Sequence, residues 1–176
     1  LGDVYKRQGQ SVVGNLLLET CETMNGMWGY KIKDQNYKSV TDLVRLLVRA
    51  AGKGANLLMN IGPQPNGELP AVAVERLKGV GEWMSKYGET IYGTTAGNVM
   101  SASWGTTTRK DNMLYVHLLA DRMPQFVTLP VTERVVTSTL FGTSEKVKWE
   151  KIQGGIVLHT ENLKPSVDCI VALKLK

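Results

Sequence analysis

Cysteine and histidine are scarce in this chain of 176 residues, which has two of each. Cys21 and Cys169 are too few for a disulfide-rich scaffold or a cysteine-ligated zinc site. His117 and His159 lie far from both cysteines in the sequence. A histidine-rich metal centre and a Ser-His-Asp triad therefore have little to draw on, and we expect neither a metal ion nor a cofactor.

Long apolar runs and clusters of like charge are also missing. The longest apolar runs are too short to span a bilayer, so we expect no membrane association. The net charge is +5, with 11 basic and 9 acidic side chains in residues 1–89 and 10 and 7 in residues 90–176. A nucleic-acid-binding surface would concentrate that excess on one segment or face. We therefore expect no nucleic-acid partner.

The first residues fit no element that follows them. The chain lacks an initiator Met, and residues 1–8 (LGDVYKRQ) contain no apolar stretch of the kind found in a signal peptide. We interpret residues 1–8 as foreign or junction sequence, with a natural loop as the alternative. With 43% apolar residues, the rest of the chain can bury the core of one ordinary domain or two small ones.

The sequence of residues 9–92 predicts alternating strands and helices, the βα repeat of a parallel α/β sheet or barrel. The apolar run 12–18 reads as a short buried strand that ends at Glu19. A capping pattern at 39–42 precedes helical spacing, and residues 56–61 then read as a strand buried on both faces. Pro70 fits the first turn of a second helix. Apolar residues mark the buried sides of the two helices: Leu43, Leu46, Leu47 and Ala50 in the first; Val74, Leu77, Val80, Met84 and Tyr87, with Trp83 beside them, in the second.

Residues 93–176 predict a second region made of strands. Short runs rich in Val, Leu, Thr and aromatics alternate with Gly, Ser and Thr turns, which is typical of an antiparallel β-sandwich. About six or seven strands are expected. They fall at 114–118, 126–129, 134–140, 147–150, 156–159 and 169–175, with 110–112 as the turn before the first.

Two features of the first half could carry chemistry. Glu19 would stand at the carboxyl end of a strand, where parallel barrels place catalytic groups, and a partly apolar site there would raise its pKa toward that of a general acid. The alternative is a solvated loop glutamate. Glu22 lies three residues on, and because two carboxylates so close together on a turn tend to point apart, it is expected to point away from Glu19. Trp28, in the Trp28-Gly29-Tyr30 cluster, could stack on a sugar or could pack over the end of the barrel.

Three segments together resemble a known family. They are residues 19–30 (ETCETMNGMWGY), residues 54–63 (GANLLMNIGP) with Asn66-Gly67, and residues 77–92 (LKGVGEWMSKYGETIY). In this order and spacing they resemble the C-terminal portion of the α-L-fucosidases of glycoside hydrolase family 29. Residues 15–95 carry the resemblance well, and the β-rich tail is similar to the family's sandwich more loosely.

The resemblance implies a (β/α) barrel followed by a β-sandwich, and hydrolysis of terminal α-L-fucose with retention. In the family an Asp is the nucleophile, and the general acid/base is the Glu of a Trp-Glu pair ahead of the Trp-Gly-Tyr motif. Glu19 occupies that Glu position, although Leu18 stands where the family usually has Trp. The nucleophile and the fucose-binding histidines lie upstream in the family, and their motifs are not in this chain.

The expected chain is therefore a fucosidase fragment that supplies Glu19 but no nucleophile and is inactive alone. Its expected partners are a fucosylated glycan and the missing N-terminal part of its own barrel. The family suggests a periplasmic or secreted location. The alternative function is a non-catalytic sandwich that binds carbohydrate or supports the barrel. Binding would need a row of exposed aromatics, and the few available are Trp104, Tyr115, Phe126, Phe141 and Trp149.

Overall fold

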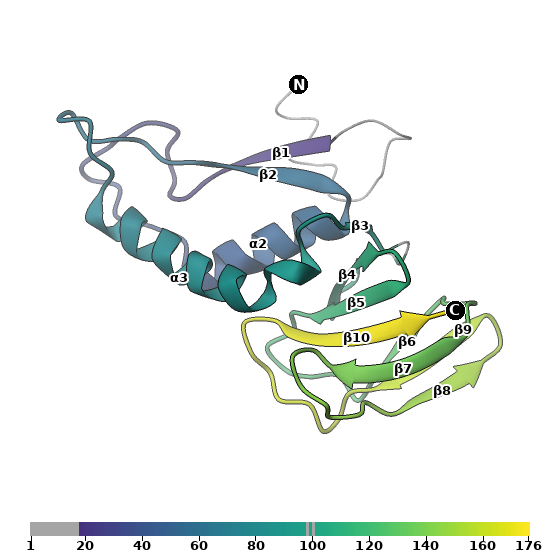
Figure 1. The fold of residues 1–176 in the computed structure, drawn as a ribbon. Helices are drawn as coiled ribbons and strands as arrows, with labels where there is room; N and C mark the ends of the chain where they lie inside the picture. The colour runs from purple at the N-terminus through teal and green to yellow at the C-terminus, as the bar shows by residue number, and fades with distance from the viewer. Residues whose placement is uncertain (1–17, 98, 100) are drawn as a thin grey trace.

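A computed structural model describes residues 18–97, 99 and 101–176 of the chain (Figure 1). The expected junction at residues 1–8 and the expected strand residues 12–17 lie outside the described residues. Two regions are visible in Figure 1. Two strands and two helices form the first, and eight strands form the second.

The first region is a parallel strand pair covered by helices on one side. The order is β1 (Leu18–Thr23), α2 (Val40–Gly52), β2 (Ala55–Asn60) and α3 (Ala71–Tyr87), followed by the short helix η1 (Gly88–Thr90). β1 and β2 pair in parallel, with α2 as the crossover between them. Both helices lie on the same side of this pair in Figure 1. The predicted strand–helix–strand–helix order is confirmed.

α2 begins where the sequence predicts. Ser39 is the N-cap, its hydroxyl accepts a hydrogen bond from the backbone N–H of Asp42, and the Asp42 carboxylate accepts one from the Ser39 N–H. This hydrogen bonding, led by the Ser39 side chain, lowers the pKa of Asp42. The buried side of α2 is confirmed in part: Leu43 and Ala50 are buried as expected, but Leu46 and Leu47 are only partly covered. Val44 and Val48 are buried instead.

Two further burial expectations are wrong. β2 is not buried on both faces, since Leu58 is 50% exposed. The helices cover one face of the β1–β2 pair, and no described element covers the other. In α3, Trp83 is buried, whereas Leu77 is exposed. Pro70 stands immediately before α3 as its N-cap residue.

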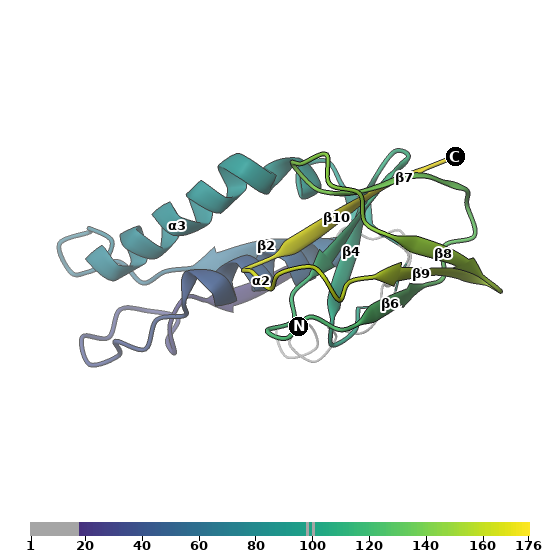
Figure 2. The same cartoon turned by 90° about the horizontal axis from the view of Figure 1, so that it is seen from below.

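The second region is an antiparallel sandwich (Figure 2). One sheet has the order β3-β4-β5-β10-β7, and the other has the order β6-β9-β8. The bounds are β3 (Thr95–Ala96), β4 (Gly105–Lys110), β5 (Met113–Leu118), β6 (Phe126–Leu129), β7 (Val135–Leu140), β8 (Trp149–Ile152), β9 (Gly155–His159) and β10 (Cys169–Leu175). Between the sheets lies an apolar core, to which β5 and β10 contribute Leu114, Val116, Leu118, Val171 and Leu173.

β3 and β4 are strands that the sequence reading does not include. Three consecutive threonines in β4, Thr106 to Thr108, are fully buried. Their hydroxyls make the segment look like a polar turn. In the fold, however, the Thr108 hydroxyl donates to the Thr90 carbonyl, and the Thr106 hydroxyl is hydrogen-bonded to that of Ser101. The expected turn at 110–112 is confirmed, because Asp111, with φ 51°, lies between β4 and β5.

The five-stranded sheet also packs against the helices. Tyr115, Ile170 and Ala172, on its outer face, form a second core with Val44 and Val48 of α2 and with Trp83 of α3. At the edge of this contact Gly52 lies so close to β4 that a Cβ there would be 2.1 Å from the Thr106 hydroxyl. The sheet is therefore covered on both faces, by the helices and by the second sheet.

Candidate active site

The uncovered side of the β1–β2 pair carries the first candidate residue. In the parallel register Glu19 is level with Asn56, Cys21 with Leu58, and Thr23 with Asn60. Side chains alternate along a strand, so these residues share one face, while Met59 on the other face packs among the helices. We call this surface the open face: Glu19, Cys21, Asn56, Leu58 and Asn60, with Thr23, which is buried, at its carboxyl end.

Glu19 does not stand at the carboxyl end of its strand, so that expectation is wrong. β1 continues to Thr23, and four residues at about 3.3 Å each place Glu19 about 13 Å short of the strand end. The apolar run stops at Leu18, but backbone pairing with β2 extends the strand through polar residues. Glu19 is exposed, and within the described residues its carboxylate makes no hydrogen bond or ion pair.

Glu22 lies on the opposite face, as expected. Its carboxylate is 3.4 Å from the ammonium group of Lys38, and both side chains are about one-third exposed. Lys38 also donates to the carbonyl of Thr23 at 2.5 Å. Glu22 therefore helps to hold the residues that precede α2 and does not reach the open face.

Trp28 lies beyond the carboxyl end of β1, in the loop that leads toward α2. Its residue exposure is 51%. The amide nitrogen of Asn60, the last residue of β2, donates to the Trp28 carbonyl at 2.5 Å. The structure thus ties the Trp28 loop to β2, a contact that the spacing of the two residues in the sequence does not indicate. Glu19 lies near the start of β1, whereas Trp28 lies beyond its end, so the two residues are separated along the direction of the strand.

Both histidines lie on strands of the sandwich, His117 on β5 and His159 on β9. His117 is fully buried, with Nδ1 2.7 Å from an Asp168 carboxylate oxygen and Nε2 3.0 Å from the Thr108 hydroxyl. The order of these groups is that of a nucleophile, base and acid, but all three are buried and Thr108 donates to the Thr90 carbonyl. No substrate can reach them. His159 lies 3.3 Å from Glu150.

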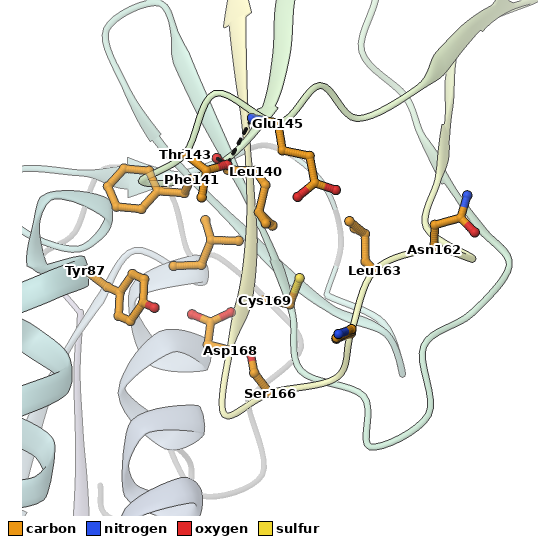
Figure 3. A pocket seen from close by; sticks show the side chains of 12 residues that line it. Tyr87, Leu140, Phe141, Thr143, Glu145, Asn162, Leu163, Ser166, Asp168 and Cys169 are labelled. Carbon is orange, nitrogen blue, oxygen red and sulfur yellow. Dashed lines mark hydrogen bonds between the residues drawn. The ribbon is translucent and has the colours of Figure 1, made fainter.

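A pocket of about 380 Å³ lies at the junction of α3 and the sandwich loops, and Asp168 is one of its lining residues (Figure 3). Tyr87 lines one side, and Asp168 and Cys169 lie at the start of β10. Burial, with the nearby carboxylates of Asp168 and Glu145, raises the pKa of the Cys169 thiol to about 11. Neither Glu19 nor Trp28 lines this pocket.

The sandwich does not present the row of aromatics that carbohydrate binding would need. Tyr115 is buried, Trp104 and Trp149 pack against the inter-sheet core, and Phe141 packs beside the helices. Of the aromatic residues described in the sandwich strands, Phe126 alone is strongly exposed, at 58%. The aromatics favour a supporting role for this region.

Comparison with known proteins agrees with the motifs. The family model for α-L-fucosidase matches residues 4–89. The chain is 31% identical over 144 residues to an α-L-fucosidase of Branchiostoma floridae, a match that covers 77% of this chain and 32% of that protein. It is 30% identical to human plasma α-L-fucosidase, with 82% of this chain and 34% of that protein covered.

Solved structures extend the match into the sandwich. α-L-fucosidase isoenzyme 1 from Paenibacillus thiaminolyticus is similar, with a TM-score of 0.79 and 30% identity, over 92% of this chain and 40% of that one. The α-fucosidase of Thermotoga maritima in complex with fucose gives a TM-score of 0.78 and 26% identity, with the same two coverages. Because 92% of the chain is covered, both regions of the fold are included.

These matches define a glycoside hydrolase fold, and the chain belongs to the α-L-fucosidase family, glycoside hydrolase family 29. It spans about a third of the length of the curated relatives named above. The predicted resemblance is confirmed. None of the helices in the described part of the chain is long and apolar enough to cross a membrane.

Proposed function

We propose that this chain is the C-terminal part of a retaining α-L-fucosidase and that Glu19 is its general acid/base. The supporting observation is the orientation of the carboxylates of β1 and β2. These strands contain two, Glu19 and Glu22; the register puts Glu19 on the open face and turns Glu22 toward Lys38. Glu19 is therefore the carboxylate of this strand pair that can face a substrate.

The proposed reaction has two steps. In the first, an upstream Asp carboxylate attacks the anomeric carbon of fucose, and the carboxylic acid of Glu19 gives its proton to the departing glycosidic oxygen. In the second, the Glu19 carboxylate takes a proton from water as the water oxygen displaces the Asp from the anomeric carbon. Fucose leaves with its original configuration, and Glu19 is again protonated.

The missing nucleophile has a proposed place beside the β1–β2 pair. Both strands have one unpaired edge in the described structure, and helices cover one face only. These are properties of the last βα units of a (β/α) barrel whose other strands come from upstream. On this proposal residues 9–92 complete the barrel, and residues 93–176 are the sandwich that supports it.

Trp28 is the proposed substrate-binding residue. Its exposure of 51% is unusual for an indole, and the loop that carries it lies at the carboxyl ends of β1 and β2, where barrel enzymes bind their substrates. An aromatic face there would stack on the apolar side of a sugar ring. The plasma location named for the human relative supports a secreted protein, with a periplasmic location as the bacterial counterpart.

The test compares Glu19→Gln with Glu22→Gln in the full-length enzyme, in which the upstream barrel precedes this chain. Two fucosides are used, one with an alkyl leaving group and one with a dinitrophenyl group that leaves without a proton. For Glu19→Gln we expect kcat/KM to fall about 10²- to 10⁴-fold on the alkyl fucoside and far less on the activated one. Added azide should restore turnover of the activated fucoside and give fucosyl azide.

Glu22→Gln is the matched control and should retain near-normal activity on both substrates. If Glu19→Gln cleaves both fucosides like the unaltered enzyme, Glu19 is not the acid/base. If Glu22→Gln shows the leaving-group dependence instead, the proton comes from Glu22. The chain without its upstream part should be inert, and turnover by that chain would contradict the missing nucleophile.

A further inference from the structure

Asn60 bonds both ends of the segment that carries Trp28. Its backbone carbonyl accepts a hydrogen bond from the Met24 N–H at 3.0 Å, and its side-chain amide donates to the Trp28 carbonyl at 2.5 Å. Residues 24–28 therefore form a short loop that closes on one residue at the end of β2. Met24, at the base of this loop, is fully buried.

The backbone of Gly29 and Tyr30, the next part of the loop, lies in close contact with Gly62, which follows β2. A Cβ at Gly62 would lie 2.3 Å from the Tyr30 nitrogen and 2.4 Å from the Gly29 carbonyl carbon. Both are backbone atoms, so they could not move without displacing the Trp28 loop. Gly62 is buried, and it is the absence of a side chain there that allows the two segments to touch.

The base of the loop is fixed from a third direction. The Lys38 N–H donates to the Met24 carbonyl at 2.8 Å, and the Lys38 ammonium group donates to the Thr23 carbonyl. The backbone around Trp28 is thus held at Met24 and at Trp28 itself, yet the residue stays half exposed. A fixed backbone under an exposed indole favours a preformed stacking surface, because the loop that carries the ring then loses little freedom on binding.

From these contacts we infer that Asn60 and Gly62 are positioning residues that hold Trp28 in place for the sugar. This inference rests on the proposed function of Trp28. Neither residue needs to touch the substrate, since each acts through the loop backbone. The Asn60 amide donates the hydrogen bond to the Trp28 carbonyl, and Gly62, without a side chain, allows the backbone of Gly29 and Tyr30 to approach.

Asn60→Asp is the sharpest variant, because it keeps the size of the side chain and replaces the donating nitrogen by oxygen. Two oxygens would then face each other at Trp28, and the loop should move away. Gly62→Ala attacks the same loop sterically. The matched controls are Asn162→Asp, an exposed asparagine of the sandwich, and Gly81→Ala, whose Cβ would meet nothing within 4 Å.

The first readout is the indole N–H signal of Trp28 in a ¹H–¹⁵N NMR spectrum, assigned by its loss in Trp28→Phe. Asn60→Asp and Gly62→Ala should shift or broaden it, and the two controls should not. The second readout is fucoside hydrolysis by the full-length enzyme. Asn60→Asp should raise KM about tenfold and leave kcat within about twofold, since stacking that is equal in the bound substrate and transition state affects KM. In Trp28→Ala the further change Asn60→Asp should add little.

Three results would overturn the inference, and they are distinguishable. If Asn60→Asp leaves both the Trp28 signal and KM unchanged, Asn60 does not position the loop. If Trp28→Ala raises KM while Asn60→Asp does not, Trp28 binds sugar without needing the clamp. If Asn60→Asp moves the Trp28 signal but neither Asn60→Asp nor Trp28→Ala changes KM, the proposed function of Trp28 fails and the contact from Asn60 only stabilises the loop. Should Gly62→Ala not fold, Asn60→Asp carries the test alone.

Discussion

The Nδ1 atom of His117 lies 2.7 Å from a carboxylate oxygen of Asp168, and both side chains are completely buried. His117 is on β5, and Asp168 immediately precedes β10, so the pair joins two neighbouring strands of the five-stranded sheet. Through Thr108 and the Thr90 carbonyl, the same network reaches the segment that follows α3.

Replacing Asp168 should therefore be costly. Asp168→Asn leaves the buried imidazole of His117 without its carboxylate, and we expect a loss of about 3 kcal/mol in the free energy of unfolding. Urea denaturation measures this. The control is Asp121→Asn, which removes a carboxylate that is 90% exposed and paired with Arg45, and should cost less than about 1 kcal/mol. Equal losses in the two variants would contradict a special role for the buried pair.

The contact between α2 and β4 gives a second prediction. Gly52→Ala places a methyl group against the Thr106 side chain, with the Thr106 Cβ only 2.9 Å away, and should destabilise the protein by about 1–3 kcal/mol. Gly81→Ala, inside α3 with open space around it, should stabilise by up to about 1 kcal/mol. Thermal unfolding of both variants compares them. A Gly52→Ala protein as stable as Gly81→Ala would show that the helix can shift.

The two thiols should differ in reactivity. With its pKa raised to about 11, Cys169 is about one part in a thousand thiolate at pH 8, and it is buried. Cys21 is partly exposed on the open face. Iodoacetamide at pH 8 should therefore modify Cys21 first, as peptide mass spectrometry would show, and Cys169 should follow only as pH approaches 11. Faster modification of Cys169 at pH 8 would contradict its burial.

Tyr115 gives a prediction at alkaline pH. Burial, with help from the hydrogen bond that its hydroxyl donates to Glu89 at 2.9 Å, raises the pKa of Tyr115 to about 12 from 10.0. Its contribution to stability is fully present below pH 10 and is lost as pH rises from 10 to 12. Tyr115→Phe should cost about 1 kcal/mol at pH 8 and weaken the fall in stability between pH 10 and 12. Urea unfolding at several pH values tests both.

Local signals in the sequence predicted much of the fold. The capping box at Ser39 and the turn at Asp111 depend on residues close in the chain, and both are confirmed. β4 escaped prediction because three consecutive threonines look like a polar turn, whereas the fold buries them and gives the Thr108 hydroxyl a partner distant in sequence, the Thr90 carbonyl. Expected burial of Leu58 failed for a different reason. If the upstream part of the barrel precedes this chain, as proposed, the residues that cover Leu58 belong to that part.

The candidate site was harder to predict than the elements that carry it. Glu19 looked like a strand end because apolarity stops at Leu18, yet the strand continues wherever backbone pairing does. Glu22 points away from Glu19 as expected, but the reason is alternation along β1 and not the expected turn. A hydrogen bond from a side chain to a distant carbonyl leaves no periodic pattern in the sequence. The contact from Asn60 to Trp28 could therefore be found only in the structure.

The five-stranded sheet of the sandwich is covered by helices on one face and by the second sheet on the other, so the two regions of this chain cannot be separated freely. Cutting the chain between α3 and β3 would strip the cover from Tyr115, Ile170 and Ala172 and expose an apolar patch to water. The sandwich is therefore bound to the helices as a permanent partner. A gene fusion that transfers the sandwich to another protein would have to include α2 and α3. Otherwise the apolar residues of the exposed sheet face would have to be replaced by polar ones.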